Sequence, residues 1–119
     1  PCAAARKLLG EDYIIGVSAH NPAEAKTALQ SGADYLGCGA VFGTATKADV
    51  KKLGTEGLMA ICREKGLPVV GIGGVTADNY REVRAAGADG AAIVSGILAQ
   101  PDIRTTVEAI AKVSQEFAK

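Results

Sequence analysis

The densest group of residues that could bind an anion is Thr44-Ala45-Thr46-Lys47, with two hydroxyls and one ammonium within four positions. Hydroxyl and ammonium groups donate hydrogen bonds to phosphate or carboxylate oxygens, and the charged donor makes the stronger bond. The alternative interpretation is a solvated surface loop that binds nothing. A Schiff-base role for Lys47 is less favoured, because such a lysine needs desolvation to lower its pKa and this segment is polar.

A pair of adjacent glycines, Gly73-Gly74, offers a second way to bind an anion, through the backbone. Without side chains in the way, backbone N–H groups can approach a phosphate closely. Ser95-Gly96, which follows a later apolar stretch, could add two more donors. Turn geometry or close packing explains such glycines equally well, so the pair alone does not decide between these interpretations.

The other reactive residues favour structural roles. His20 is the single histidine, and no cysteine or second histidine stands at metal-ligand spacing, so we expect no metal site in this chain. The odd number of cysteines and the lack of a CxxC pair predict free thiols in a reducing compartment. Cys38 and Cys62 are interpreted as small buried hydrophobic residues.

These candidate residues must be positioned by strands and helices, and an internal repeat indicates which ones. A shift of the sequence by about 55 positions superimposes Ile14–Ala19 on Val69–Gly74 and Gly32–Asp34 on Gly87–Asp89. Each copy reads as a strand, a turn, an amphipathic helix, a glycine stop and a second strand. Two copies predict an α/β chain, βαβαβαβα, with a parallel sheet and right-handed crossovers.

Helix signals set the expected bounds. Asn21, Thr55 and Thr76 are predicted N-caps, and Glu24 is predicted to complete a capping box with Asn21. The expected strands are about 13–18, 34–39, 68–73 and 88–95, and the expected helices are about 22–31, 55–65, 76–86 and 103–117.

Two architectures fit this pattern: a small open sheet, or part of a (β/α)8 barrel. A whole barrel needs about 250 residues, so four βα units in 119 residues make half of one. We therefore expect one domain, residues 1–119, that needs a partner segment to close its sheet. In either architecture, ligands bind where the strands end and the chain enters the helices, at segments 18–21, 39–52, 73–76 and 95–97.

Composition excludes several classes of function. Thirteen basic residues balance thirteen acidic ones, which argues against a general nucleic-acid binder or a binder of anionic membranes. Hydrophobic residues make up 48% of the chain, too many for a disordered protein. No apolar stretch approaches the roughly 18 residues of a membrane span, and no signal-peptide pattern is present.

Four motifs carry a resemblance to a known family. IIGVSAHNPAEA, GADYLGCGAVFGTATK, LPVVGIGGV and AGADGAAIVSGI resemble the thiamine-phosphate synthase family, in the same order and at compatible spacings. The resemblance extends from Ala5 to Ile97, and its most specific elements are Thr-x-Thr-Lys and Ile-Gly-Gly. It implies that the chain is the C-terminal half of a TIM (β/α)8 barrel whose N-terminal half is missing.

The resemblance also implies the chemistry. That family takes part in thiamine biosynthesis: it joins a pyrimidinylmethyl diphosphate to a thiazole phosphate with the help of Mg²⁺, which gives thiamine phosphate and pyrophosphate. By resemblance, Ser18 and Lys47 contact the diphosphate and carry the catalysis, and we expect the enzyme to be cytoplasmic, with an organelle as the alternative. The thiazole phosphate would be bound by a set of residues at the strand ends: Thr44, Thr46, Gly74, Val94 and Ser95.

Departures from the family leave other interpretations open. The family's metal-binding aspartates and pyrimidine loop are absent, so Mg²⁺ ligands are expected in the missing half and the chain alone is expected to be inactive. One alternative is a thiazole tautomerase-like barrel, although Ala40 stands where that group has its catalytic histidine. Another is a non-catalytic, phosphate-binding half-barrel domain. For His20 we favour a structural role in the turn over catalysis.

Overall fold

The computed structural model describes residues 1–43, 53–64 and 66–118. Within them, four strands form one parallel sheet in the order β1-β2-β3-β4, which confirms the α/β class and the parallel topology. The strands are β1 (Gly16–Ala19), β2 (Tyr35–Cys38), β3 (Val69–Ile72) and β4 (Gly90–Ala92). The helices are α1 (Cys2–Leu9), α2 (Pro22–Gln30), α3 (Gly54–Cys62), α4 (Tyr80–Ala85), α5 (Ser95–Leu98) and α6 (Ile103–Phe117).

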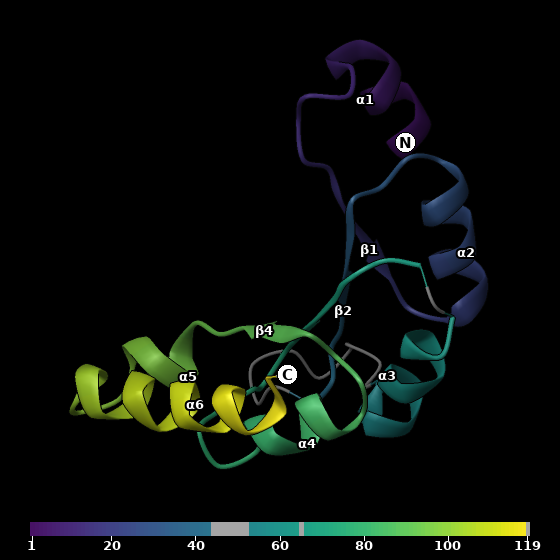
Figure 1. The fold of residues 1–119 in the computed structure, drawn as a ribbon. Coiled ribbons are helices and arrows are strands. Elements are labelled where there is room, and N and C mark those ends of the chain that lie inside the picture. Colours follow the sequence, from purple (N-terminus) through teal and green to yellow (C-terminus); the bar gives the residue numbers. More distant parts are fainter. Residues whose placement is uncertain (44–52, 65, 119) are drawn as a thin grey trace.

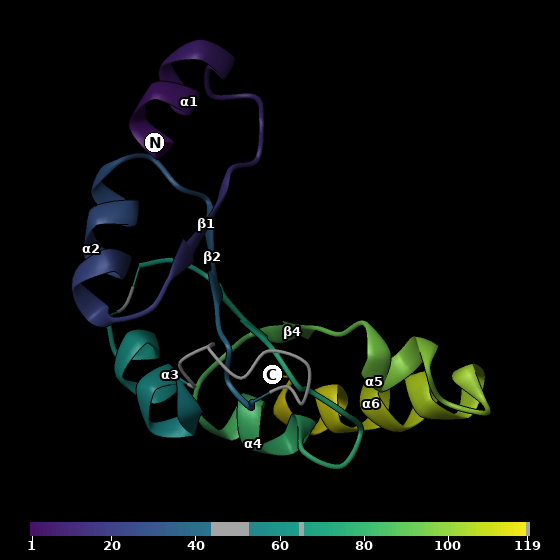
Figure 2. The same cartoon turned by 180° about the vertical axis from the view of Figure 1, so that it is seen from behind.

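Helices α2, α3 and α4 lie along one side of the sheet, and no helix of the described residues covers the opposite side in either view (Figures 1 and 2). On the covered side, alternate strand residues such as Leu36, Cys38 and Val69 are buried against helix residues such as Leu58 and Val83. Alternation follows from the period of two in a strand, which sends successive side chains to opposite faces.

The uncovered side of the sheet presents small residues and exposed apolar ones. The strand register aligns Ser18 with Gly37, and Gly37 with Val70. Tyr35 and Ile72 are about two-fifths exposed there, at 39% and 42%. A sheet covered on one face only is what half of a barrel presents, because the interior of a barrel is filled jointly by all its strands.

The repeat has a clear structural basis in its Gly-Ala-Asp motif. Asp34 Oδ2 accepts a hydrogen bond from the Ile15 N–H at 2.8 Å, and Asp89 Oδ2 accepts one from the Val69 N–H at 2.9 Å. The backbone N–H groups of the two aspartates also donate, Asp34 to the Ile15 carbonyl and Asp89 to the Val69 carbonyl, each at 2.8 Å. The motif therefore joins the start of one strand to the start of the next. The bond from Ile15, with Arg6 beside it, holds the pKa of Asp34 below its ordinary value of 3.8.

Helix α6 has the predicted bounds, and the predicted Asn21 cap of α2 is present, but two predicted caps are wrong. Helix α3 begins one residue before Thr55 and has no side-chain cap. Helix α4 begins at Tyr80 because Thr76 starts a separate turn, in which its hydroxyl accepts from the Asp78 N–H. The strands are also shorter than predicted: β2 and β3 lose one residue at each end, and β4 keeps only Gly90–Ala92. Strand β1 begins later than predicted, at Gly16, and ends one residue later, at Ala19.

Two helices were not predicted from the sequence. Ser95 and Gly96, expected in a loop, begin the short helix α5. Helix α1 precedes the repeat, and Arg6 holds it in place by donating to the carbonyls of Gly32, Gly10 and Tyr13. Within the described residues, no helix is both long enough and apolar enough to cross a bilayer.

Candidate functional site

The carboxyl ends of β3 and β4 enclose a hollow of about 210 Å³. It brings together Gly74, Val94 and Ser95, three residues that the sequence predicts to share a phosphate site. Ile72 and Gly73 complete the side contributed by β3, and Gly96 lies at the start of α5. The lining is mainly apolar, and Ser95 supplies its one side-chain hydroxyl. An anion here would be bound by that hydroxyl and by backbone N–H groups.

The two glycines adopt conformations that other residues rarely adopt. Gly73 has φ 103° and Gly74 has φ 68°. A Cβ on Gly74 would stand 2.9 Å from the Cβ of Phe42 and 3.2 Å from the carbonyl oxygen of Gly43. Packing and turn geometry therefore require glycine here whether or not a ligand binds. The same contacts bring Gly43, the residue before Thr44, beside Gly74.

Asn79 fixes the turn that follows these glycines, and sequence reasoning missed it. Its side-chain oxygen accepts from the Thr76 N–H at 2.7 Å, and its amide nitrogen donates to the Gly74 carbonyl at 3.0 Å. With its carbonyl held in this way, the Gly74 peptide has a defined orientation. The sequence signal was an asparagine three residues after Thr76, a spacing typical of side-chain-capped turns.

A second hollow, of about 200 Å³, adjoins the first at the carboxyl ends of β1, β2 and β3. Ser18 of β1 and His20, just after β1, line it on one side, and Gly39 and Ala40 line it from the segment after β2. Ile72 and Gly73 line both hollows. Two ligands bound in the two hollows would therefore meet over these two residues.

His20 is held by Glu24, the third residue of α2. One oxygen, Glu24 Oε1, accepts from the His20 N–H at 2.9 Å and lies 2.8 Å from His20 Nδ1. The predicted capping box is therefore half correct: Asn21 Oδ1 accepts from the Glu24 N–H at 2.8 Å, but Glu24 returns to His20 and not to Asn21. Glu24 bonds to His20 because that residue offers it two groups, the backbone N–H and the ring Nδ1. The bonds from His20 hold the pKa of Glu24 below its ordinary value of 4.5.

Three predicted site residues lie outside the described part of the chain. They are Thr44, Thr46 and Lys47, which belong to segment 44–52. The structure thus brings Gly74, Val94 and Ser95 together in one hollow and puts Ser18 in the adjoining one, and the roles of all seven stay predictions.

The cysteine thiols lie away from these hollows. Cys38 is buried on the helix-covered side, as predicted, and Cys62 is only half-buried. Burial raises the pKa of each thiol to about 11, and Cys62 adds to the effect on Cys38 while Asp89 adds to that on Cys62. Neither thiol is ionised near neutral pH, so neither is an activated nucleophile.

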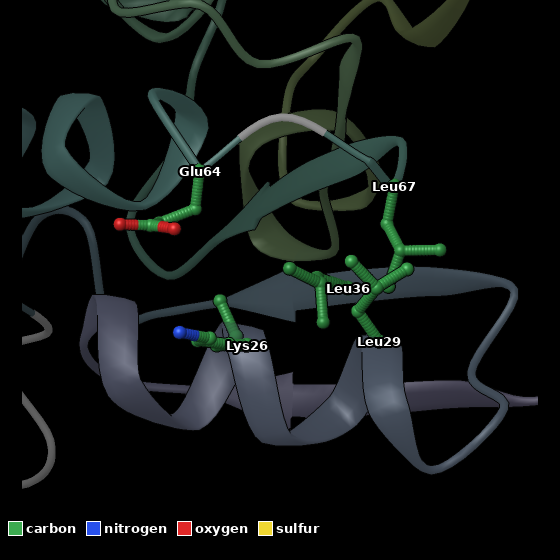
Figure 3. Close-up of a pocket in the computed structure, with 6 residues that line it drawn as sticks. Lys26, Leu29, Leu36, Glu64 and Leu67 are labelled. Carbon is green, nitrogen blue, oxygen red and sulfur yellow. The ribbon is translucent and has the colours of Figure 1, made fainter.

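A third hollow, of about 140 Å³, lies between α2 and the segment after α3 (Figure 3). Leu29, Leu36 and Leu67 form one end of it, and Lys26 and Glu64 lie at the other. Leu29, on α2, is 43% exposed. This hollow is mainly a gap between leucine side chains and offers no convergent set of anion donors.

Mg²⁺ does not fit the residues that line the two adjoining hollows. The ion takes oxygen ligands, chiefly carboxylates together with substrate phosphates and water. Neither hollow has a carboxylate in its lining. Across residues 1–43, 53–64 and 66–118, no group of three or more His, Cys, Asp or Glu side chains is placed to hold a metal.

Comparison with known proteins identifies relatives that share both sequence and fold. The family described as thiamine monophosphate synthase matches residues 1–97. The thiamine-phosphate synthase of Ruminiclostridium cellulolyticum is 45% identical over 113 residues, which cover 95% of this chain and 54% of that protein. The one from Coprothermobacter proteolyticus is 46% identical over 110 residues, which cover 92% and 52%.

A solved structure agrees with this assignment. The thiamine phosphate pyrophosphorylase from Pyrococcus furiosus superimposes with a TM-score of 0.89 and 39% identity, over 100% of this chain and 56% of that one. The chain spans about half the length of the curated relatives it matches. With a matching family over most of its residues, and with relatives that share its parallel α/β fold, this chain belongs to the thiamine monophosphate synthase family.

Proposed function

We propose that residues 1–119 form the C-terminal half of a thiamine-phosphate synthase, whose N-terminal half completes the barrel. The observation that carries the proposal is the pair of adjoining hollows at the strand ends, which share Ile72 and Gly73. Two anionic substrates bound side by side need two such sites with a common wall. The family assignment supplies the identity of the substrates.

The proposed reaction transfers a pyrimidinylmethyl group. The C–O bond between the methylene carbon and the diphosphate breaks, and its electron pair leaves on the pyrophosphate oxygen. The lone pair of the thiazole nitrogen then forms the new C–N bond, which gives thiamine phosphate. This transfer demands stabilisation of negative charge at the leaving oxygen more than proton transfer.

We assign the hollow between β3 and β4 to the thiazole phosphate. Gly74, the backbone at Val94 and the Ser95 hydroxyl would donate to it, together with Thr44 and Thr46. The two threonines are included because of the resemblance of Thr44-Ala45-Thr46-Lys47 to the family's Thr-x-Thr-Lys element. We assign the hollow lined by Ser18 to the diphosphate, where Lys47 would neutralise the departing charge.

The same proposal places the Mg²⁺ ligands outside this chain. Because the described residues do not fit the ion, its ligands would come from the N-terminal half, and no step is assigned to it here.

We also propose a cytoplasmic location. The free thiols Cys2, Cys38 and Cys62 support it, since free thiols are typical of a reducing compartment.

Genetic complementation tests the proposal. This chain is joined to the part of the Ruminiclostridium cellulolyticum relative that it does not cover, and this fusion, called the completed barrel below, is expressed in a bacterium that lacks its own thiamine-phosphate synthase. The proposal predicts growth without added thiamine. A completed barrel that folds and binds phosphate but does not support growth would favour a non-catalytic binding domain. Conversion of one thiazole phosphate isomer into another would instead favour a tautomerase, in spite of Ala40.

A further inference from the structure

We infer that His20 binds the diphosphate through Nε2, and that Glu24 positions its imidazole for that contact. The inference rests on the proposed function and extends it, because it names a residue of the diphosphate site in addition to Ser18 and Lys47. It is carried by two observations: both Ser18 and His20 line the same hollow, and one carboxylate oxygen holds His20 by its backbone and its ring.

The strand geometry explains why His20 and Ser18 share a hollow. The two residues are separated by one position, Ala19, which is fully buried on the helix-covered side. Since side chains alternate along a strand, Ser18 leaves on the opposite side, and His20 follows directly after the end of β1. Both residues therefore line one hollow, which has no carboxylate in its lining.

The bond to Glu24 determines what the imidazole can do. With Nδ1 directed at the carboxylate, Nε2 is the ring nitrogen left for a ligand. When the ring carries a proton on both nitrogens, Nδ1 donates to the carboxylate while Nε2 stays free to donate to a ligand. A protonated His20 therefore offers the diphosphate an N–H donor and a positive charge.

The bond at Nδ1 is more than the turn requires. Closing the turn before α2 needs only the bonds from the His20 N–H to Glu24 and from the Glu24 N–H to Asn21. The extra bond to a ring that is otherwise 65% exposed restricts its rotamers before any ligand arrives. Such restriction lowers the entropic cost of binding, which is the general advantage of a preorganised site.

Two substitutions in the completed barrel separate a ligand contact from a structural role. In His20→Asn the amide nitrogen mimics Nδ1, so the bond to Glu24 is kept and the reach of Nε2 is lost. In His20→Gln the amide mimics Nε2, so the reach is kept and the bond to Glu24 is weakened. The Kd for inorganic pyrophosphate is measured by calorimetry at saturating Mg²⁺ for both variants, for His20→Ala and for Glu24→Gln. Gln30→Ala, on an exposed residue of α2, is the control.

The inference predicts that His20→Ala and His20→Asn weaken pyrophosphate binding about 10- to 100-fold, the range for a lost bond to a charged group. His20→Gln should retain part of the affinity, and Glu24→Gln should lose less than His20→Ala. Binding of inorganic phosphate in the other hollow should not change. A purely structural role predicts the reverse order of pyrophosphate affinity. His20→Asn would then bind like wild type, and His20→Gln would lose both affinity and melting temperature.

Failure of the inference differs from failure of the proposed function. Unchanged pyrophosphate binding in His20→Ala, or no pyrophosphate binding by the unmodified completed barrel, would overturn the role of His20. A completed barrel that makes no thiamine phosphate, yet binds pyrophosphate in a His20-dependent way, would overturn the proposed function and leave the anion contact in place.

Discussion

Lys47 is the side chain on which the proposed chemistry depends most. If its ammonium stabilises the leaving oxygen, the bond strengthens as charge develops, so its loss appears in kcat more than in KM. Lys47→Ala in the completed barrel should lower kcat about 10- to 100-fold, since a bond to a charged group is worth about 1.5–3 kcal/mol.

The matched variants for Lys47 distinguish the alternatives. Lys47→Arg should recover part of the loss because the charge is kept, whereas a Schiff-base lysine would not be replaced by arginine. Lys26→Ala, on an exposed residue of α2, is the control. A Lys47→Ala enzyme within twofold of wild type in kcat would support the solvated-loop interpretation.

Ser95 tests the other hollow without the strain that a substitution at Gly74 would introduce. Ser95 lines the hollow between β3 and β4 and is an exposed residue, so Ser95→Ala should fold normally. Loss of one bond to a charged phosphate should raise the KM for the thiazole phosphate about tenfold. Steady-state kinetics with each substrate varied in turn measures this, with Gln100→Ala as the control. An effect confined to the pyrimidine substrate would contradict the assignment of the two hollows.

Within each βαβ unit, one aspartate joins the two strand starts. Asp89→Ala would leave the Val69 N–H without its acceptor and should lower the free energy of unfolding by about 1–3 kcal/mol. Asp89→Asn should lose less, because the amide oxygen still accepts. Urea unfolding of the completed barrel measures both, beside Asp78→Ala, an exposed aspartate in a turn. If Asp78→Ala and Asp89→Ala lowered the free energy of unfolding equally little, the Gly-Ala-Asp motif would not be what stabilises the repeat.

The elements follow from the sequence wherever a local signal and the repeat agree. Apolar strands, the Asn21 cap and the glycine stops predict the parallel sheet and α2, and parallel strands bring Gly74, Val94 and Ser95 to one edge. Helix α1 lies before the repeat, and its position depends on long-range bonds of Arg6 to carbonyls around Gly32. The roles of Asn79 and Glu24 depend on turn geometry, which residue types alone do not specify.

At the scale of the whole molecule, the residues that the structure describes form a sheet with one face covered by helices, and its edge strands β1 and β4 each pair with one neighbour only among them. Exposed strand edges and apolar residues on an open face promote association. We predict that the isolated 119-residue chain makes no thiamine phosphate and associates with itself as its concentration rises, which sedimentation velocity would detect. A monomeric isolated chain with synthase activity would contradict the half-barrel interpretation.

The most direct test of the central claim is product stoichiometry in the purified completed barrel. With both substrates and Mg²⁺ present, thiamine phosphate and pyrophosphate are quantified over time by liquid chromatography. If this chain supplies the phosphate and diphosphate sites of a synthase, the two products appear in a one-to-one ratio, and Lys47→Ala slows both equally. Pyrophosphate release without thiamine phosphate, or a folded barrel that binds both substrates and forms neither product, would contradict the account.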